Sequence, residues 1–312
     1  MRQPHAYPRK SRVSAVRKWK RHWQYYLLVA LPLLYILIFK YIPMFGVLIA
    51  FKEYNVVQGI LGSPWAGLDY FKQIFDTPFI WDYFKNTLEI SLYGMLVGFP
   101  APIALALALN EIRNGRFKKT VQMVTYAPYF ISTVVIVSIL IVNLSPNTGL
   151  MSSLFRSLGL EPIDFMGKPG WFTSIYVWSD VWQFVGYGAI IYIAALAGVN
   201  PELYEAAKVD GATRRQKIVH IDLPSLVPVM VILLILNMGN VMSVGFEKMY
   251  LMQNPLNQAS SEVISTYVYK VGLLETNFSF SAAVGLLNSV INFILLVLVN
   301  FIAKKVSSTS LW

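Results

Sequence analysis

The sequence predicts an all-α membrane protein with six transmembrane helices, and three observations support this prediction. Of the 312 residues, 56% are hydrophobic and only 13% are charged, and the mean hydropathy of +0.53 is well above that of ordinary soluble domains. Six mostly apolar runs reach the roughly 20 residues that a helix needs to cross the hydrocarbon core. Basic residues gather between alternate runs, which is typical of multi-pass proteins.

The six apolar runs give the transmembrane helices in order. They cover residues 24–49, 86–110, 120–143, 171–198, 225–246 and 278–303. The first is too long for a signal peptide and is followed by no cleavage site of the A-x-A kind, so we expect it to be retained. Gly94, Gly98, Pro100 and Pro102 predict a bend in the second helix. The chain divides into a basic N-terminal segment (1–23), a six-helix domain (24–303) and a tail (304–312).

Lysine and arginine predict the orientation of these helices. Residues 1–23 carry eight basic residues and no acidic one, and ten more lie in 111–119, 204–224 and the tail. The alternate connections carry only seven, in 51–85, 144–170 and 246–277. Because positive charge stays on the cytoplasmic side, both termini are predicted to be cytoplasmic. We interpret the basic N-terminal segment as a topology signal attracted to anionic membrane lipids, and not as a surface that binds nucleic acid.

A charged stretch, residues 200–224, lies between the fourth and fifth helices and predicts a compact helix-turn-helix element. Asn200 can cap a helix start, and Pro201 suits the first helical position. Residues 203–209 are expected to be helical. Gly211 then stands where a left-handed residue ends a helix, so the chain is expected to turn there.

The second half of this stretch predicts a short helix over about residues 212–220. Leu223-Pro224 is expected to end it, and Ser225 to cap the fifth transmembrane helix. An amphipathic linker at the membrane surface is the alternative interpretation. The small Ala206-Ala207 pair and the hard glycine turn favour a docking element for a cytoplasmic protein, because small residues let another surface approach the backbone.

These residues resemble the EAA loop of membrane subunits of bacterial ATP-binding-cassette (ABC) importers. The matching pattern, spaced as in the carbohydrate-uptake group, is Glu205-Ala206-Ala207, two residues, Asp210-Gly211-Ala212, then Ile221, Leu223-Pro224 and Pro228. Ile218 departs from the pattern, in which an aromatic residue is usual, and predicts a reshaped contact. Similarity to permeases for oligosaccharides and polysaccharide fragments continues in PMFGVLIAFKEYN (43–55), NTLEISLYG (86–94), APYFIST (127–133), NPLNQASSEVISTYVYKVGL (254–273) and FSFSAAVGLLNSVINFILLVLVN (278–300).

The resemblance implies the fold of a type I ABC importer permease in the bacterial cytoplasmic (inner) membrane. It implies contact between the EAA loop and a cytoplasmic ABC ATPase dimer through Tyr204, Glu205, Ala206, Ala207, Asp210, Gly211, Ala212, Ile218, Leu223 and Pro224. It also implies a second related permease subunit, an external solute-binding protein and a carbohydrate substrate. The sequence contains no G-x-x-x-x-G-K-[ST] phosphate loop, so we expect ATP and Mg to be bound by the partner ATPase and this chain to have no cofactor.

Polar residues inside the apolar runs predict a passage for a polar solute, because burying polar groups in a membrane costs free energy and usually serves a function. Amides can bond sugar hydroxyls and aromatic rings can cover sugar faces. The predicted pathway residues are Trp178, Trp182, Gln183, Asn237, Asn240, Asn288 and Asn292. Helix packing by amides and interfacial anchoring by tryptophan are the alternative interpretations.

An ion-coupled secondary sugar transporter is the alternative function, because Glu89 and Asp180 are carboxylates inside predicted helices. We expect water to reach both from the outer side, and Lys40 to snorkel or to pair with one of them. The sequence predicts neither an enzyme nor a metal site. Cysteine is absent, no paired catalytic carboxylates or nucleophile elbow occurs, and the histidines are scattered at His5, His22 and His220.

Overall fold

The computed structural model describes residues 15–306, and side chains within residues 22–305. This part of the chain is helical and contains no β-sheet, apart from an isolated antiparallel bridge between Lys52 and Trp65. Residues 1–14 of the predicted basic segment and residues 307–312 of the tail lie outside the described residues.

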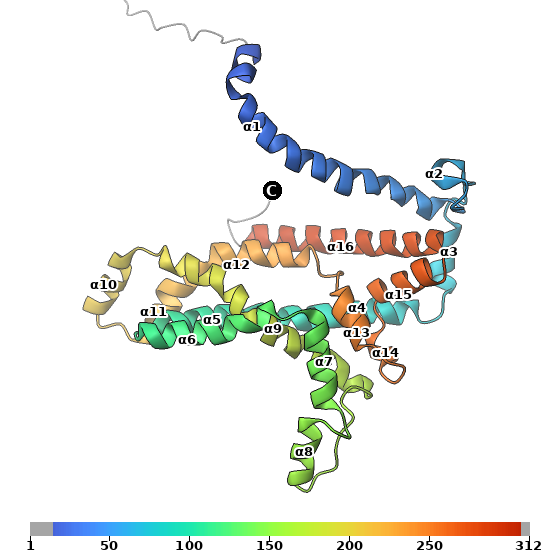
Figure 1. Cartoon of the computed structure of the whole chain (residues 1–312). Coiled ribbons are helices and arrows are strands. Elements are labelled where there is room, and N and C mark those ends of the chain that lie inside the picture. The colour runs from blue at the N-terminus through green and yellow to red at the C-terminus, as the bar shows by residue number, and fades with distance from the viewer. Residues whose placement is uncertain (1–14, 307–312) are drawn as a thin grey trace, which may run out of the picture.

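Six membrane-spanning elements are present in the described chain, if one bent pair of helices is counted as a single span (Figure 1). The five uninterrupted elements are His22–Phe51, Ile80–Glu111, Pro169–Ala197, Arg214–Met238 and Phe278–Lys305, and the bent pair is Gly115–Phe130 with Thr133–Leu144. The predicted all-α fold with six spans is therefore confirmed. The structure differs from the prediction inside the third and fifth spans.

The helices are named as in Figure 1. The long ones are α1 (Ala15–Ile36), α4 (Ile80–Gly98), α5 (Pro100–Glu111), α6 (Gly115–Tyr126), α7 (Thr133–Leu144), α9 (Pro169–Ala197), α12 (Leu223–Met238) and α16 (Phe278–Val306). The short ones are α2 (Gly59–Gly62), α3 (Asp69–Asp76), α8 (Leu150–Ser157), α10 (Pro201–Val209), α11 (Arg214–Lys217), α13 (Phe246–Met252), α14 (Gln258–Ser261) and α15 (Ile264–Tyr269). Tighter or wider helical turns extend several of them, at Leu37–Tyr41, Ile42–Phe51, Ala127–Phe130, Ile218–Asp222 and Lys270–Leu274.

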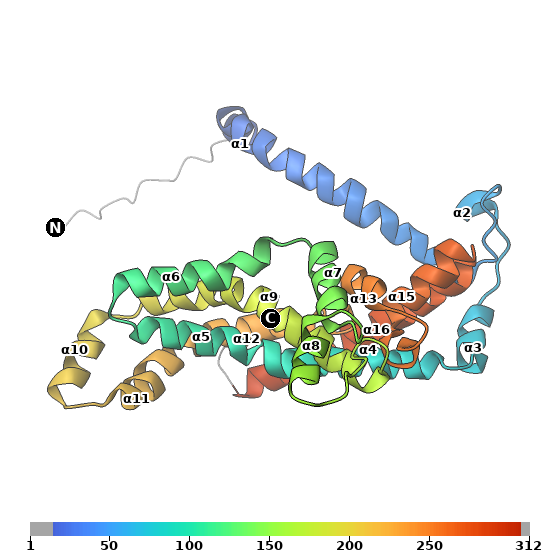
Figure 2. The same cartoon turned by 60° about the horizontal axis from the view of Figure 1, so that its bottom comes forward.

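Helix α9 is the centre of the bundle (Figure 2). It packs against α4, α5, α6, α12 and α14. One apolar cluster joins α9 to α4, α7 and α13, and a second joins it to α5 and α12. Helix α1, in contrast, diverges from the bundle, and each large hydrophobic side chain from Trp23 to Ile36 is exposed. These apolar surfaces suit lipid or another membrane subunit.

The second span passes from one helix to the next where its glycines and prolines predict a bend. Helix α4 ends at Gly98, and α5 begins at Pro100. Proline at the first position of α5 has no backbone N–H to donate, so the chain loses one helical hydrogen bond there.

The third span is not the continuous helix predicted over residues 120–143. Helices α6 and α7 meet at an angle of 97° around residues 131–132. Ser132 accepts a bond from the Val135 N–H and starts α7 as a new helix. Helix α9 supports the break, because the Gln183 amide donates to the Ile131 carbonyl oxygen at 3.1 Å.

The fifth span also differs from the prediction, because it runs as one helix from Arg214 to Met238 and stops eight residues early. Leu223-Pro224 does not end the preceding helix. A π-helical turn over Ile218–Asp222 widens the backbone, and the Leu223 N–H bonds to the Ile218 oxygen. Ser225 caps nothing, since its hydroxyl donates back to the Ile221 oxygen.

Candidate functional site

The first candidate site is the predicted helix-turn-helix element, formed by α10 and α11 at one end of the bundle (Figure 1). Helix α10 starts as predicted, with the Asn200 side chain accepting from the Glu202 N–H at 3.1 Å and Pro201 at the first helical position. It ends at Val209, and Gly211 has a φ of +71°. The Ala212 and Gly211 N–H groups bond to the Ala207 and Lys208 oxygens, which is a Schellman motif. Thr213 and Gln216 then form a capping box that starts α11.

A hydrogen bond ties this element to the fifth span. The Tyr204 hydroxyl donates to Oδ1 of Asp222, whose side chain is fully buried and whose Oδ2 has no partner among the described atoms. The pKa of Tyr204 is raised to about 12, first by burial and then by the hydrogen bond to the Asp222 carboxylate. The tyrosine therefore remains a neutral donor at physiological pH.

A weaker electrostatic tie joins the element to the second span. Glu111, the last residue of α5, lies 3.9 Å from Arg214 Nε and 3.8 Å from Lys217 Nζ. These contacts are partly exposed, and such ion pairs contribute at most about 1 kcal/mol each. The element is thus held to the spans mainly through Tyr204 and the helix continuity of α11 with α12.

The outer face of the element is free to receive another surface. Glu205, Ala206 and Asp210 are exposed, and neither carboxylate forms an ion pair within the described chain. Between α10 and α11 lies a hollow of about 350 Å³, lined by Ala207, Asp210, Gly211, Ala212, Gln216, Lys217, His220 and Ile221. Of the other predicted coupling residues, Ile218 is half-buried in the π-helical turn, and Leu223 and Pro224 are exposed. The arrangement offers small side chains and unpaired carboxylates to a partner.

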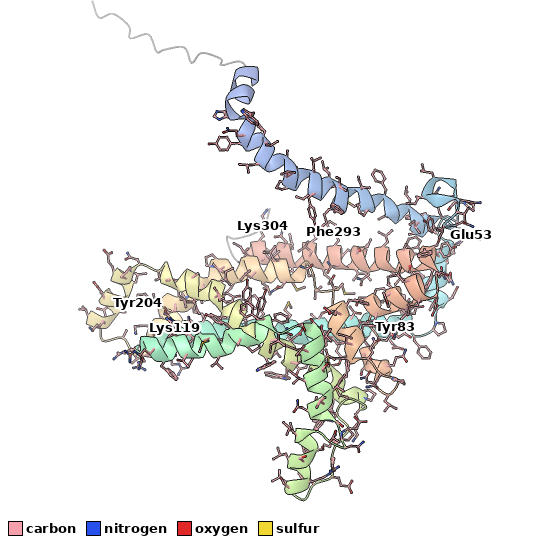
Figure 3. The ribbon with its side chains drawn as sticks, in the orientation of Figure 1. Glu53, Tyr83, Lys119, Tyr204, Phe293 and Lys304 are labelled. Carbon is pink, nitrogen blue, oxygen red and sulfur yellow. The ribbon has the colours of Figure 1, made fainter. Side chains whose placement is uncertain are left out.

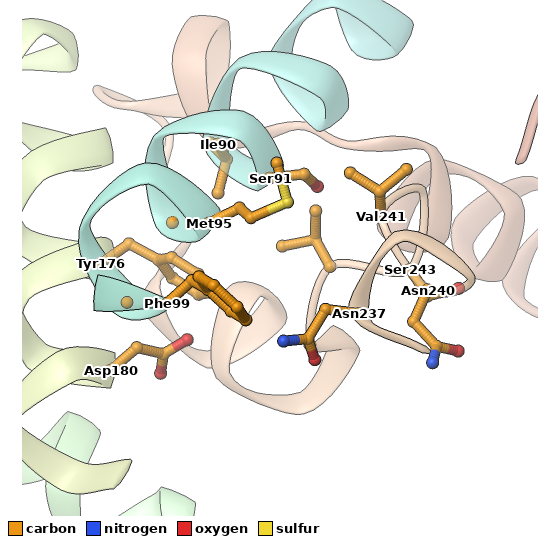
Figure 4. A pocket seen from close by; sticks show the side chains of 14 residues that line it. Ile90, Ser91, Met95, Phe99, Tyr176, Asp180, Asn237, Asn240, Val241 and Ser243 are labelled. Atoms are coloured by element: carbon orange, nitrogen blue, oxygen red, sulfur yellow. The ribbon is translucent and has the colours of Figure 1, made fainter. Parts of the chain in front are cut away.

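The second candidate site is a polar cavity between α4, α9 and the end of α12 (Figure 4). It has a volume of about 340 Å³, and its polar lining consists of Ser91, Tyr176, Asp180, Asn237, Asn240 and Ser243. A second hollow of about 350 Å³ shares Tyr176, Asp180 and Asn237 with it and continues along α9 to Pro102 and Gly188. In Figure 4 the Asp180 and Asn237 side chains point toward the same space from opposite walls.

The predicted pathway residues are found in three environments. Asn237 and Asn240 line the cavity, but Asn240 lies in the turn after α12 and not mid-helix. Trp178 and Trp182 are exposed on α9, and the Trp178 indole N–H donates to the Tyr93 hydroxyl at 3.0 Å. The side chains of Trp178 and Trp182 therefore lie on an outer face of this subunit.

The remaining three predicted residues use their amides for helix and turn bonds. Gln183 supports the bend of the third span, as described above. Asn292 accepts from the Met242 N–H and donates to the Gly239 oxygen, and Asn288 donates to the Met242 oxygen at 3.3 Å. These two asparagines fasten α16 to the turn that follows α12, and their place in the passage stays a prediction.

An ion pair beside the cavity was missed by sequence reasoning. Lys248 Nζ lies 2.6 Å from Asp180 Oδ1, and the lysine side chain is only 6% exposed. Asp180 thus pairs with Lys248 and not with Lys40. Lys248 lies in α13, within a connection predicted to be outside the membrane, so its charge carried no functional signal. In the sequence, the only indication of its burial is the set of apolar residues around it, Val244, Met249 and Met252, which are all buried in the structure.

The fold is that of a multi-pass membrane protein with a polar cavity and an exposed helix-turn-helix element at one end. The family model described as "Binding-protein-dependent transport system inner membrane component" matches residues 98–308, and the chain belongs to this family. It is therefore a permease subunit of the ABC importer class, as the EAA-like residues predict.

Two relatives from Bacillus subtilis (strain 168) are similar over most of the chain. Protein LplB is 42% identical over 300 residues, which are 96% of this chain and 94% of LplB. The polygalacturonan/rhamnogalacturonan transport system permease protein YteP is 43% identical over 280 residues, 90% of this chain and 87% of YteP.

A solved structure confirms the permease fold. A chain in the crystal structure of a bacterial ABC transporter involved in the import of the acidic polysaccharide alginate matches with a TM-score of 0.87 and 36% identity, over 94% of this chain and 99% of that chain. A bacterial alginate ABC transporter in complex with an alginate pentasaccharide-bound periplasmic protein gives the same TM-score.

Proposed function

We propose that this chain is the membrane-spanning permease subunit of an ATP-driven importer of an oligosaccharide or polysaccharide fragment. The substrate class is supported by YteP and by the alginate importer, whose names refer to transport of polymers of this kind. Polar cavity groups support it too, because the Asn237 and Asn240 amides and the Asp180 carboxylate can bond sugar hydroxyls. We place Trp178 and Trp182 on the route to this cavity.

We further propose that a separate ATPase drives the permease through α10 and α11, and one observation carries this proposal. Helix α10 follows α9 after a short turn, and α11 continues into α12 without a break. Helices α9 and α12 both line the cavity. A partner that moves α10 and α11 therefore moves two cavity walls as rigid bodies, which suits alternating access.

We propose three partners for this chain. The ATPase dimer binds ATP and Mg, and a second related permease covers apolar faces that are exposed here. An external solute-binding protein delivers the sugar, by analogy with the alginate transporter and its pentasaccharide-bound periplasmic protein. The chain itself performs no enzymatic reaction in this scheme.

We place the protein in the bacterial cytoplasmic membrane with α10 and both termini on the cytoplasmic side. Figure 3 shows Lys119 and Tyr204 toward one end of the bundle and Glu53 at the opposite end. Basic residues of 111–119 and 208–217 gather at the α10 end, as positive charge does on the cytoplasmic side.

The test is charge reversal on the exposed outer face of α10. Glu205→Lys is expected to leave membrane insertion intact and to lower substrate-stimulated ATPase activity of the assembled complex at least about tenfold, because an unpaired carboxylate is replaced by the opposite charge at a contact. Glu161→Lys, an exposed change in the α8–α9 connection, is the matched control and should leave stimulation unchanged. Equal stimulation in both variants would count against the proposal, and uptake that persists without ATPase but fails with a protonophore would favour a secondary transporter.

A further inference from the structure

The buried ion pair between Asp180 and Lys248 sets the charge of the cavity. Asp180 comes from α9 and Lys248 from α13, and their charged atoms are 2.6 Å apart. Their exposures differ: the aspartate side chain is 35% exposed and lines both hollows, whereas the lysine is 6% exposed and lines neither. A solute in the cavity therefore meets the carboxylate, while the ammonium group lies behind it.

Asp180 is the one charged residue among those that line the two hollows. Its carboxylate can accept two sugar hydroxyls, as carboxylates have several acceptor sites. Without a countercharge, it would also repel an anionic solute. At the effective dielectric constant of protein interiors, two carboxylates about 5 Å apart weaken binding at least about tenfold.

Lys248 removes this repulsion without taking part in the lining. Its Nζ also lies 5.1 Å from the centroid of the Tyr176 ring, whose negative face stabilises the cation. The lysine is held from two sides, by a carboxylate and by an aromatic ring of α9. The pair keeps the net charge of the cavity near zero, while one carboxylate still faces the solute.

We propose that Lys248 is a specificity-determining residue: by neutralising Asp180, it lets the cavity bind uronate-containing, acidic oligosaccharides as well as neutral ones. This inference rests on the proposed function and names its substrate class. The names of YteP and of the alginate importer, which are 43% and 36% identical to this chain, refer to transport of acidic polysaccharides and support this inference. The structure assigns the role to charge compensation, because Lys248 is too buried to bind the sugar itself.

The experiment measures binding of two matched trisaccharides to the purified complex of both permeases with the ATPase, without the external binding protein. One probe is trigalacturonate, and the other is its carboxyl-reduced counterpart, in which a neutral hydroxymethyl group replaces each carboxylate. The measured quantity is the ratio of the two affinities, acidic over neutral. Variants are Lys248→Met, Asp180→Asn and the double substitution.

We expect the affinity ratio to fall at least about tenfold in Lys248→Met, to rise in Asp180→Asn, and to return to within about threefold of the wild-type ratio in the double variant. If Lys248→Met fails to assemble because Asp180 has lost its countercharge, the affinity ratios of Asp180→Asn and of the double variant still test the inference, since neither variant has a carboxylate in the cavity. A ratio that falls in Asp180→Asn, or that stays constant across all variants, overturns the inference alone. A wild-type complex that binds neither sugar overturns the proposed function as well.

Discussion

The two ends of α9 differ in how the chain around them is held. At one end, α10 and α11 are largely exposed and are tied to the spans by few contacts, chiefly the hydrogen bond from Tyr204 to Asp222 and partly exposed ion pairs with Glu111. At the other end, the loop segment 253–266 is densely bonded. Its partners are the Asn86 amide, the Thr87 hydroxyl and the Met166 and Pro169 oxygens, reached through Glu262, Ile264, Asn254, Asn257, Ala259 and Ser260.

We infer from this difference that α10 and α11 serve motion, whereas segment 253–266 serves stability. A sparsely held element can move as a unit with its neighbouring helices, but it depends on each of its few contacts. A densely held segment spreads its stability over many bonds and keeps its shape. Single substitutions should therefore uncouple the first end without unfolding it, and destabilise the second without uncoupling it.

The largest effect is expected for Gly211→Val. The left-handed φ of +71° costs a β-branched residue about 1–2 kcal/mol, so the turn between α10 and α11 should rearrange and substrate-stimulated ATPase activity should be lost. Gly159→Val is the matched control, because Gly159 has a φ of +73° and the same open surroundings but lies far along the chain from the coupling element. Loss of stimulation in both variants, or in neither, would remove the distinction between the two ends.

A smaller effect is expected for Tyr204→Phe. It leaves the fully buried Asp222 without its donor, at a cost of about 1–3 kcal/mol, and should reduce stimulated ATPase activity about tenfold while ATPase binding persists. Tyr192→Phe is the control, since Tyr192 is equally aromatic and only 3% exposed, with no side-chain hydrogen bond in the described chain. Loss of assembly in place of coupling would show that the bond serves folding only.

At the densely bonded end, Asn257→Ala should lower the stability of the permease and leave its coupling to the ATPase unchanged. Asn257 is fully buried, donates to the Met166 and Met252 oxygens and accepts from Ser261. Its removal should destabilise the permease by about 1–3 kcal/mol, which lowers the melting temperature by several degrees. Stimulated ATPase activity per folded complex should not change, and Leu256→Ala, at a neighbouring residue that is 67% exposed, should alter neither quantity.

The smallest effect is expected from pH. The pKa of Tyr204 is raised from 10.0 to about 12, so the neutral hydroxyl donates fully below pH 10, and its contribution is lost only as pH rises toward 12. Coupling, measured as stimulated over basal ATPase activity, should therefore be constant between pH 7 and 9. A decline that is present in the wild type and absent in Tyr204→Phe would contradict the assigned protonation state.

Local patterns in the sequence were sufficient for much of the fold and for the bounds of α10 and the turn after it. Apolar runs and basic loops indicated the spans, and Asn200, Pro201 and Gly211 fixed the bounds of α10, because caps and left-handed turns depend on neighbouring residues alone.

Features that depend on contacts between distant segments could not be predicted. The break in the third span needs Gln183, and also Gly186, where a Cβ would lie 2.0 Å from the Thr125 oxygen of α6. Lys248 is an ordinary loop lysine in the sequence until the fold brings it to Asp180, 68 residues away in the chain. The π-helical turn that accommodates Pro224 was likewise hidden, because proline in sequence usually ends a helix.

The central claim is that α10 and α11 dock into an ATPase, and proximity tests it most directly. The chain has no cysteine, so a single cysteine at Ala206 or Ala212 can be crosslinked in working membranes without background from this subunit. Val57→Cys, at a residue 94% exposed toward the opposite end, is the control. We predict adducts with the nucleotide-hydrolysing subunit from positions 206 and 212 and none from position 57; an ATPase that is reached from position 57, or from no position, would contradict the account.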